Sequence, residues 1–391
     1  MAERLWSGRG LLLAIGVIAI VAIAMAVIGH GDGRGPTPRA SDDARSATGE
    51  SAATPAGAAD RRGGPCGPTR GFFGPGRWPG GCWRPYGPHS PFNQPLPSRP
   101  RLAADSAAIV RRLLGFGAIQ NAAIGTADTF DDFGHAVYFA GARDPRYSLR
   151  CNGRYGRCPL DGGSVRVPGP ARPAAGNDAH LAVVDQRTGR EDDLFGVIDK
   201  PRRGGILRFT FGGSTSVGGS GLRAGATASG FGLLAGTIRA AELERGEIRH
   251  ALFVTVLCDN GRAVYPAVGV GRPCSFVGRA MAGAPPMGAR LQLALSPRVV
   301  SALPVPGWAR TILEAMARYG MFVGDTGGSS WGLQLESGTT YTSFGYPDPL
   351  VAFARRAGIP RYQGRYVLSL RDVVNWRNLR VIAPCVSARR C

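Results

Sequence analysis

The stretch Gly225–Val256, GATASGFGLLAGTIRAAELERGEIRHALFVTV, holds the pattern around which the rest of the chain is organised. It begins with glycines and other small residues, crosses a charged turn, and ends in an apolar run rich in β-branched and aromatic side chains. Such a run is typical of a β-strand, and the glycines before it indicate tight turns. His250 opens the predicted strand and is one of five histidines in the protein. We therefore expect this segment to deliver His250 to the start of a sheet strand.

Glycine-rich and aspartate motifs around this stretch match known catalytic signatures only in part. The run from Gly212 to Gly225 has glycine spacings of a phosphate-binding loop, but it lacks the Lys-Ser/Thr pair that such a loop places on phosphate and metal. Ser229 is not part of a Gly-x-Ser-x-Gly nucleophile elbow. Asp325-Thr-Gly matches one half of an aspartic-protease pair, and the sequence has no second copy. These motifs therefore do not identify a reaction.

Short apolar runs bounded by Gly, Pro and Asp recur on both sides of this stretch and predict β-strands. We expect strands at residues 135–140, 146–150, 164–167, 179–185, 192–198, 206–211, 250–257, 263–268 and 289–295. A Thr188-Gly189 turn joins two of them into a predicted hairpin. Many short strands at roughly even spacing favour a mainly β fold, which we expect to be a single large domain of the sandwich or jelly-roll kind at residues 65–391.

A few helical segments interrupt the predicted strands. Apolar residues at helical spacing predict helices at 103–116 and 307–319. Pro306 at the entrance of the second helix and Gly320 at its exit are typical start and stop signals. Two shorter helices are expected at residues 349–356 and 369–376.

The N-terminus carries an export signal. Leu11–Ile28 is an uncharged apolar run of 18 residues, close to the length that spans a bilayer as a helix. We expect an uncleaved signal anchor, with residues 1–10 in the cytoplasm and the folded domain outside it. The alternative is a signal peptide cleaved near Ala24-Met25-Ala26. Residues 29–64 have almost no large apolar side chain and predict a disordered linker.

Eight cysteines fall in four close pairs along the chain: Cys66 and Cys82, Cys151 and Cys158, Cys258 and Cys274, Cys385 and Cys391. An even number at short separations, after an export signal, is typical of disulfides that close local loops. Sequential pairing is the simplest arrangement, although eight cysteines allow about 105 connectivities. No CxxC motif and no finger-like spacing of histidine from a cysteine pair is found, so we expect neither a metal nor a cofactor.

The chain has a formal net charge of +20, and 46 of its 47 basic residues are arginine, since Lys200 is the only lysine. The arginines are scattered along the sequence, without the clustering that a surface for nucleic acid needs. We therefore expect no nucleic-acid partner. A basic exterior instead suits an anionic cell-wall polymer or polysaccharide, and the N-terminal helix suits the membrane as the second partner.

Four polar residues on or beside the predicted strands are the candidate catalytic residues: Asp178, His180, His250 and Asp325. A glycoside hydrolase needs two carboxyl groups that flank the scissile bond, one of them with a raised pKa. A lyase needs a base such as histidine and a positive group that neutralises a uronate carboxylate. For each residue a structural role is the alternative: a buried histidine bonded to backbone, or an aspartate that anchors a turn.

Between Pro65 and Pro100 the chain is rich in proline, glycine and aromatic residues. Flat aromatic rings stack on the apolar faces of sugars, so Trp78 and Trp83, with Trp331, are candidate substrate-binding residues. The alternative is simple packing of large side chains in a segment with little regular structure.

Six phrases span about Cys82 to Gly328, most of the predicted domain. They are SPFNQPLP (90–97), NDAHLAVVD (177–185), ASGFGLLAG (228–236), GEIRHAL (246–252), PPMGARLQL (285–293) and YGMFVGDTGG (319–328). Together they resemble a family of exported, sometimes membrane-anchored bacterial envelope proteins for which no activity is established. The resemblance implies an envelope location and one intact domain, and it leaves the chemistry open.

These features lead to one expected function and one alternative. We expect a single-pass membrane protein whose extracytoplasmic domain acts on a cell-envelope or extracellular polysaccharide, as a glycoside hydrolase or a lyase. The alternative is a non-catalytic wall-binding or envelope-organising module, in which tryptophans and surface arginines contact glycan.

Overall fold

The computed structural model describes residues 66–117, 132–223, 225–328, 331–362 and 364–384, and the backbone of 122–124. This part of the chain is rich in β-sheet with few helices, as predicted. The expected membrane anchor at 11–28 and the expected linker at 29–64 lie outside the described residues. Among the residues described, no helix is both long and apolar enough to cross a membrane.

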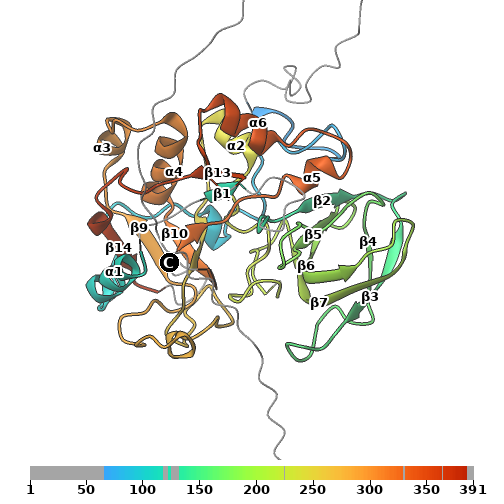
Figure 1. The fold of residues 1–391 in the computed structure, drawn as a ribbon, viewed down its shortest axis with the longest axis horizontal. Helices are drawn as coiled ribbons and strands as arrows, with labels where there is room; N and C mark the ends of the chain where they lie inside the picture. Colours follow the sequence, from blue (N-terminus) through green and yellow to red (C-terminus); the bar gives the residue numbers. More distant parts are fainter. Residues whose placement is uncertain are drawn as a thin grey trace, which may run out of the picture. The chain divides into compact units, whose positions relative to one another are not determined.

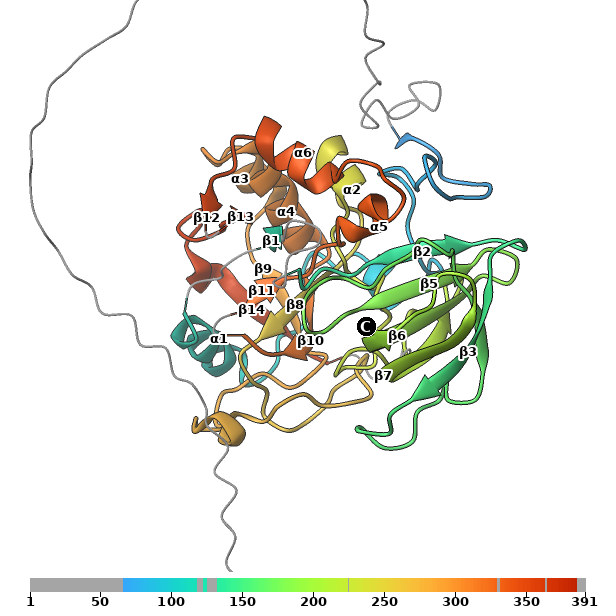
Figure 2. The same ribbon diagram turned by 45° about the vertical axis from the view of Figure 1, so that its right-hand side comes forward.

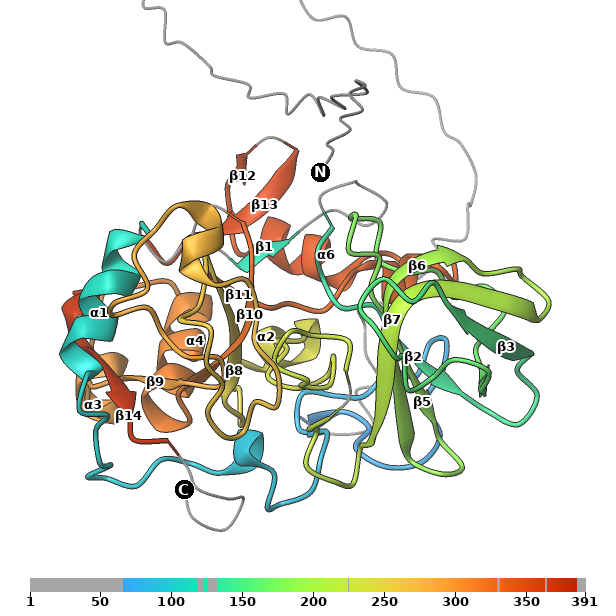
Figure 3. The ribbon, with the colours of Figure 1, turned by 90° about the horizontal axis from the view of Figure 1, so that it is seen from below.

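A six-stranded mixed sheet forms the first part of the fold (Figure 1). In spatial order its strands are β2 (Val137–Ala140), β5 (Leu181–Asp185), β6 (Arg190–Asp199), β7 (Gly205–Ser216), β3 (Arg146–Cys151) and β4 (Ser164–Arg166). β5 and β6 pair in antiparallel fashion from Asp185 and Arg190 onward, which confirms the predicted hairpin. β2 runs parallel to β5, and β3 runs parallel to β7. Figure 3 shows β6 and β7 as long curved strands of this sheet.

A second mixed sheet has five strands. Their order is β11 (Gly332–Leu333), β8 (Leu252–Val256), β10 (Met321–Thr326), β9 (Arg290–Leu293) and β14 (Leu379–Ile382). β8 and β10 are parallel neighbours near its centre. β8 and most of β10 are buried, and this explains why their sequences are continuous apolar runs without alternation. β8 is the strand predicted behind His250, and it begins two residues later, at Leu252.

The helices lie mainly around the second sheet (Figure 2). α4 (Gly307–Arg318) packs on β9, and α1 (Ser106–Gly115) packs on β14. The other helices are α2 (Ala240–Arg245), α3 (Pro297–Ser301), α5 (Thr339–Thr342) and α6 (Pro349–Arg356). A small third sheet has the order β1 (Ala122–Ile124), β13 (Arg365–Leu368) and β12 (Arg361–Tyr362).

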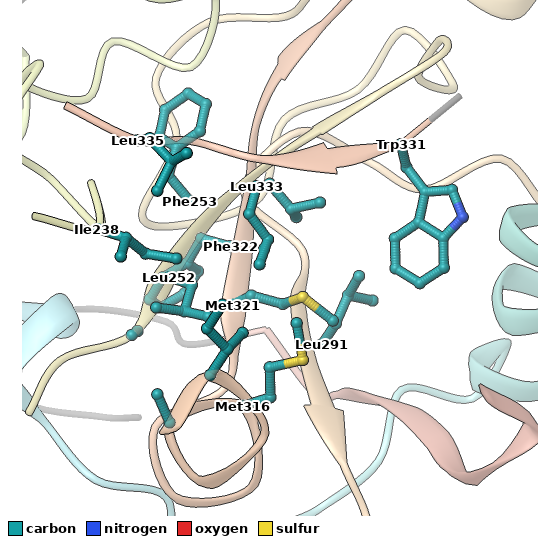
Figure 4. Packing of buried hydrophobic residues seen from close by; sticks show 14 of the residues in the cluster. Ile238, Leu252, Phe253, Leu291, Met316, Met321, Phe322, Trp331, Leu333 and Leu335 are labelled. Atoms are coloured by element: carbon teal, nitrogen blue, oxygen red, sulfur yellow. The ribbon is translucent and has the colours of Figure 1, made fainter. Parts of the chain in front are cut away.

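Two separate hydrophobic cores stabilise this arrangement. The larger core surrounds β8 and β10, where Leu252, Phe253, Met321 and Phe322 are buried together (Figure 4). The smaller core belongs to the six-stranded sheet and includes the buried side chains of Tyr147, Leu149, Leu207 and Phe209. Along β3, buried and exposed residues alternate, so the strand turns one face to this core and the other to solvent.

The structure corrects three details of the predicted fold. A jelly roll is built from antiparallel strands, whereas β2/β5, β3/β7 and β8/β10 are parallel pairs, so the described sheets are mixed. Residues 263–268 form no strand, because Pro266 has no N–H for a strand ladder, and only Ala263 makes an isolated bridge. Residues 369–376 form no helix: Asp372 adopts φ 61°, and a single 3₁₀ turn follows at Trp376–Asn378.

Three disulfides join neighbouring cysteines in sequence: Cys66–Cys82, Cys151–Cys158 and Cys258–Cys274. They confirm the predicted sequential pairing for these six residues. The fourth predicted pair, Cys385 and Cys391, lies outside the described residues. Each of the three bonds closes a loop of at most 16 residues, so each fixes local chain geometry.

Candidate active site at the end of β10

Asp325 lies at the end of β10, directly after an irregularity in the strand. The pairing of β10 with β8 shifts register between Val323 and Asp325, as in a β-bulge. Gly324 sits against the ring of Phe253 with no room for a Cβ atom, and its carbonyl accepts a hydrogen bond from the Ser229 N–H at 3.1 Å. Bulges redirect side chains and are common beside active sites. The glycine at this position is therefore what lets the chain aim Asp325 away from a regular strand position.

The half-buried carboxyl group of Asp325 is held by two backbone donors. Its Oδ2 accepts from the Ala228 N–H at 3.3 Å, and its Oδ1 accepts from the Thr326 N–H at 2.7 Å. Burial raises the pKa of Asp325 to about 6, and the negative charges of Asp178 and Asp259 add to the increase, while the two hydrogen bonds oppose it. A carboxyl group with this pKa can carry a proton in mildly acidic solution and release it near neutrality.

Asp178 lies just before β5 of the six-stranded sheet, and its charge contributes to the raised pKa of Asp325. Its carbonyl accepts from the Gly196 N–H at 2.8 Å, and the next carbonyl, of Ala179, accepts from the Val197 N–H at 3.2 Å. Between these bonds Ala179 adopts φ 39°, which is unusual for a residue with a side chain. The half-buried Asp178 carboxyl has no hydrogen-bond partner among the described residues, and burial raises its pKa. Two of the four predicted catalytic residues are thus linked electrostatically, because the charge of Asp178 raises the pKa of Asp325.

A third aspartate, Asp259, follows β8 at the same edge of the sheet. It is fully buried, and its carboxylate accepts from the N–H groups of Gly261 and Gly271 at 2.8 and 2.6 Å. These bonds use the carboxylate to shape the loop closed by Cys258–Cys274, so its role is structural. Ligands of α/β sheets bind beyond the carboxyl ends of parallel strands, which is where Asp325 lies relative to β8 and β10.

His180 is buried, and its ring contacts two other aromatic rings. The ring centroids of His135 and Phe195 lie 4.9 and 5.5 Å away. Burial, with the neighbouring charge of His135, lowers the pKa of His180 well below its ordinary value, and His180 Nδ1 has no hydrogen-bond partner. The imidazole is therefore neutral at physiological pH, and its side chain packs away from solvent.

His250 belongs to a buried ionic network. Its Nε2 lies 3.1 Å from Glu242 Oε1, and its Nδ1 lies 2.9 Å from the carbonyl of Ala251. Glu242 is also paired with Arg239 at 3.0 Å, and the positive charges of Arg239 and His250 hold the pKa of Glu242 below its ordinary value despite burial. Both ring nitrogens thus have partners, and none of these contacts reaches Asp178 or Asp325. The geometry gives His250 the structural role that the sequence left as the alternative.

Trp78 and Trp83 lie on the strap, by which we mean residues 66–94 with the Cys66–Cys82 bond. They line a cavity of about 20 Å³, which has room for about one water molecule. The Trp78 ring lies 4.6 Å from that of Tyr341, and the Arg239 guanidinium lies 5.1 Å above the Trp83 ring. Both rings are partly buried, and each has one side occupied by a neighbouring side chain.

Trp331 does not contact the cavity beneath the strap. It is fully buried in the larger core, where its Nε1 donates to the carbonyl of Gly117 at 2.9 Å (Figure 4). A tryptophan with its N–H satisfied inside a core is a packing residue. The three tryptophans therefore do not form one surface in the described part of the chain.

The sequence interpretation did not single out a buried acidic pair on β6. Glu191 and Asp193 are two residues apart, so they share one face of the strand, and both are fully buried. Glu191 Oε1 accepts from the Tyr86 hydroxyl at 3.1 Å and from the Leu234 N–H at 3.2 Å, and Asp193 Oδ2 accepts from the Leu233 N–H at 3.0 Å. The signal was present in the sequence as three consecutive acidic residues, 191–193, that lead directly into the apolar part of the strand.

The carboxyl groups of this pair keep one oxygen each without a partner, Glu191 Oε2 and Asp193 Oδ1. Burial raises the pKa of Glu191 to about 7 and, with the charge of Glu191, raises that of Asp193 well above its ordinary value. Like charges in close contact cannot both ionise easily, so the pair retains a proton near neutrality. Since both side chains are inaccessible to solvent, we regard the pair as structural.

Comparisons with protein-family models, with curated proteins and with solved structures found no match. Within the part of the chain that the structure describes, no three or more His, Cys, Asp or Glu side chains are grouped so as to hold a metal ion.

Proposed function

We propose that the protein is an acid–base enzyme that hydrolyses glycosidic bonds in a cell-envelope or extracellular polysaccharide, with Asp325 and Asp178 as the two acting carboxyl groups. The observation that carries the proposal is a half-buried carboxyl group at the end of β10 whose pKa is raised by burial and by the charge of Asp178, a second half-buried carboxyl group just before β5. Asp178 lies near enough for its charge to raise the pKa of Asp325. Glycoside hydrolases use two carboxyl groups in this way, one as acid and the other as base or nucleophile.

The two carboxyl groups differ in a way that assigns their roles. Asp325, with a pKa of about 6, gives its proton to the glycosidic oxygen as the bond to the sugar carbon breaks. Asp178 has no hydrogen bond to restrain it within the described residues, so it acts as base on the attacking water or as nucleophile. The water supplies the hydroxyl group of the new reducing end, and the proton that it loses restores the acid.

The non-catalytic alternative has less support. It places the glycan on Trp78, Trp83 and Trp331, but the first two rings are partly buried against Tyr341 and Arg239, and the third is in the core. A lyase remains a variant of the same site, in which Asp178 removes a proton from carbon. Its products differ from those of a hydrolase because elimination leaves a double bond in the new terminal sugar.

The envelope location is part of the proposal. Three disulfides favour an oxidising compartment outside the cytoplasm, and the apolar run at 11–28 is long enough to anchor the chain in the membrane. The resemblance to exported envelope proteins points to the same place. The expected partners are the membrane and an anionic wall polymer or polysaccharide.

The proposal is tested with the full chain in detergent on a panel of envelope and extracellular polysaccharides. New reducing ends report hydrolysis, and ultraviolet absorbance of unsaturated sugars reports elimination. Asp325→Asn and Asp178→Asn are each expected to reduce the rate by about 10²-fold or more, because each removes a group that takes part in proton transfer or bond formation. Asp199→Asn, at an exposed position of β6, is the matched control.

The pH dependence of the rate provides a second readout. Because Asp325 must be protonated to act as the acid, the rate falls as pH rises above about 6. This decrease in rate above about pH 6 is expected to disappear in Asp325→Asn. Full activity in both aspartate variants, or a panel on which the wild-type protein cleaves nothing, would show that the proposed function is wrong.

A further inference from the structure

Two exposed arginines lie on the segments that border Asp325. Arg223 belongs to a hairpin in which Leu222 pairs with Phe231. The backbone of Arg223 faces Gly230 across this hairpin, where a Cβ on the glycine would lie 4.0 Å from the Arg223 Cα. The same hairpin provides the Ala228 N–H that binds Asp325. Arg223 is therefore attached to the structure that positions the acid.

Arg272 borders the site from the other side. Its N–H donates to the Thr326 hydroxyl at 2.7 Å, and its carbonyl accepts from the Asp259 N–H at 3.0 Å. The first bond holds its backbone beside the residue that follows Asp325, and the second ties it to the residue whose charge also raises the pKa of Asp325. Hydrogen bonds thus set the backbone position of Arg272, and the side chains of both arginines are exposed.

Both guanidinium groups lack a carboxylate or hydrogen-bond partner among the residues that the structure describes. The charged groups that influence Asp325 are Asp178 and Asp259, so neither arginine neutralises the catalytic acid. Elsewhere in the described chain, basic side chains near acids do form pairs, as Arg190 does with Asp192 at 2.7 Å. Two exposed guanidinium groups, on segments whose backbones border Asp325, are therefore available for a ligand.

The backbone conformation of Arg223 indicates that this residue has a role other than as an ordinary exposed surface charge. It adopts φ 63°, in the left-handed region that is unfavourable for a residue with a side chain. Four non-glycine residues of the described chain have positive φ, and two of them, Ala179 and Arg223, flank the aspartate pair. Such strain is commonly found at functional sites, where the surrounding structure maintains it.

We propose that Arg223 and Arg272 bind negatively charged sugar units next to the scissile bond, so that the substrate is an anionic polysaccharide. This inference rests on the proposed function for the location of the scissile bond. Guanidinium groups bind carboxylate or phosphate oxygens through two parallel N–H donors, which a lysine cannot reproduce. The charged group on the sugar is therefore a uronate carboxylate or a phosphodiester.

Binding is measured by calorimetry in the Asp325→Asn background, which keeps a bound oligosaccharide intact. The probes are an oligogalacturonate, an oligo(glycerol phosphate) and an uncharged cello-oligosaccharide. Arg223→Gln and Arg272→Gln are each expected to weaken binding of at least one anionic probe by roughly 10-fold, the size of one lost charge-assisted contact. Arg→Lys at either position is expected to recover only part of the affinity.

Arg150→Gln, at an exposed position of β3, is the control for a general effect of net charge. Tighter binding of the uronate or of the phosphate probe identifies the charged group. Unchanged affinity in both glutamine variants, an equal loss in Arg150→Gln, or preference for the uncharged probe overturns the inference. Arginine-dependent binding without cleavage of the matching polymer by the wild-type protein would instead count against the proposed function alone.

Discussion

Asp178 and Asp325, and the residue beside Asp178, lie in environments that are costly for stability but suited to proton transfer. Burial raises the pKa values of Asp178 and Asp325, and Ala179 beside Asp178 has a strained backbone. By contrast, His180 and His250 are buried with their rings packed or hydrogen-bonded. The sequence named all four as candidates, and only their neighbours in space separate the aspartates from the histidines.

The strain at Ala179 leads to a prediction at the scale of one residue. Ala179→Gly is expected to stabilise the protein by roughly 0.5–1 kcal/mol, because glycine adopts positive φ without the Cβ penalty that alanine pays. Denaturant unfolding measures the change as a higher midpoint. Ala182→Gly, in the buried middle of β5, is the control and is expected to destabilise. An Ala179→Gly protein no more stable than the wild type would show that φ 39° is not strained here.

Among the elements, the irregular end of β10 matters most for the site. A regular strand would place successive side chains on alternate faces in register with β8. The register shift at Gly324 breaks this alternation, and the glycine-rich hairpin after Gly225 supplies donors both to the shifted strand and to Asp325. The glycines of the opening stretch therefore let its backbone come close to β10 and to the carboxyl group of Asp325. The sequence pattern had predicted the tight turns, but not this contact.

Gly324→Ala tests the strand geometry. The added methyl group meets the Phe253 ring, so we expect a loss of roughly 1–3 kcal/mol of stability from overpacking and a lower rate from displacement of Asp325. Phe253→Leu in the same chain makes room and is expected to recover part of the rate. Gly307→Ala, at an open helical position, is the matched control and is expected to leave the rate unchanged and the stability unchanged or slightly higher, because alanine favours a helix over glycine. A Gly324→Ala protein with wild-type rate and stability would mean that the bulge does not position the acid.

At the scale of the whole described unit, buried acids tie the two sheets together. Glu191 and Asp193 on β6 accept from the N–H groups of Leu234 and Leu233, in the segment that leads into α2 and β8. This contact joins the six-stranded sheet to the chain of the larger core. Because Glu191 binds a proton more tightly when folded, with a pKa of about 7 against an ordinary 4.5, its contribution to stability is complete below about pH 4.5.

The contribution is then lost as pH rises through about 7, since the folded protein must release a proton that it holds more tightly than the unfolded chain does. We expect the thermal midpoint of the wild-type protein to fall between about pH 5 and about pH 8. Glu191→Gln keeps an oxygen for the Leu234 N–H and is expected to flatten this dependence. Glu314→Gln, exposed on α4, should keep the wild-type slope. Equal slopes in all three proteins would exclude the buried pair as the cause.

Much of the fold could be predicted because strand and helix periods are local properties. The hairpin of β5 and β6, the strand after His250 and the helices α1, α4 and α6 follow from apolar spacing and turn residues. Strand direction could not be predicted, since β2 and β5, or β8 and β10, pair across long separations in sequence. For the same reason the sequence predicted Asp178 and Asp325 as separate candidates, and it could not predict that one would influence the other.

The sequence by itself determined what depends on neighbours along the chain. Its apolar runs specified the strands, and its closely spaced cysteines specified three local disulfides. Only the tertiary structure decided which polar residues meet, because that depends on how two sheets pack and on where a bulge redirects one side chain. Folding brought Asp178 to Asp325, enclosed His250 with Glu242, and buried Trp331 in a core. Burial and charge from distant segments then set the pKa values on which the proposed chemistry depends.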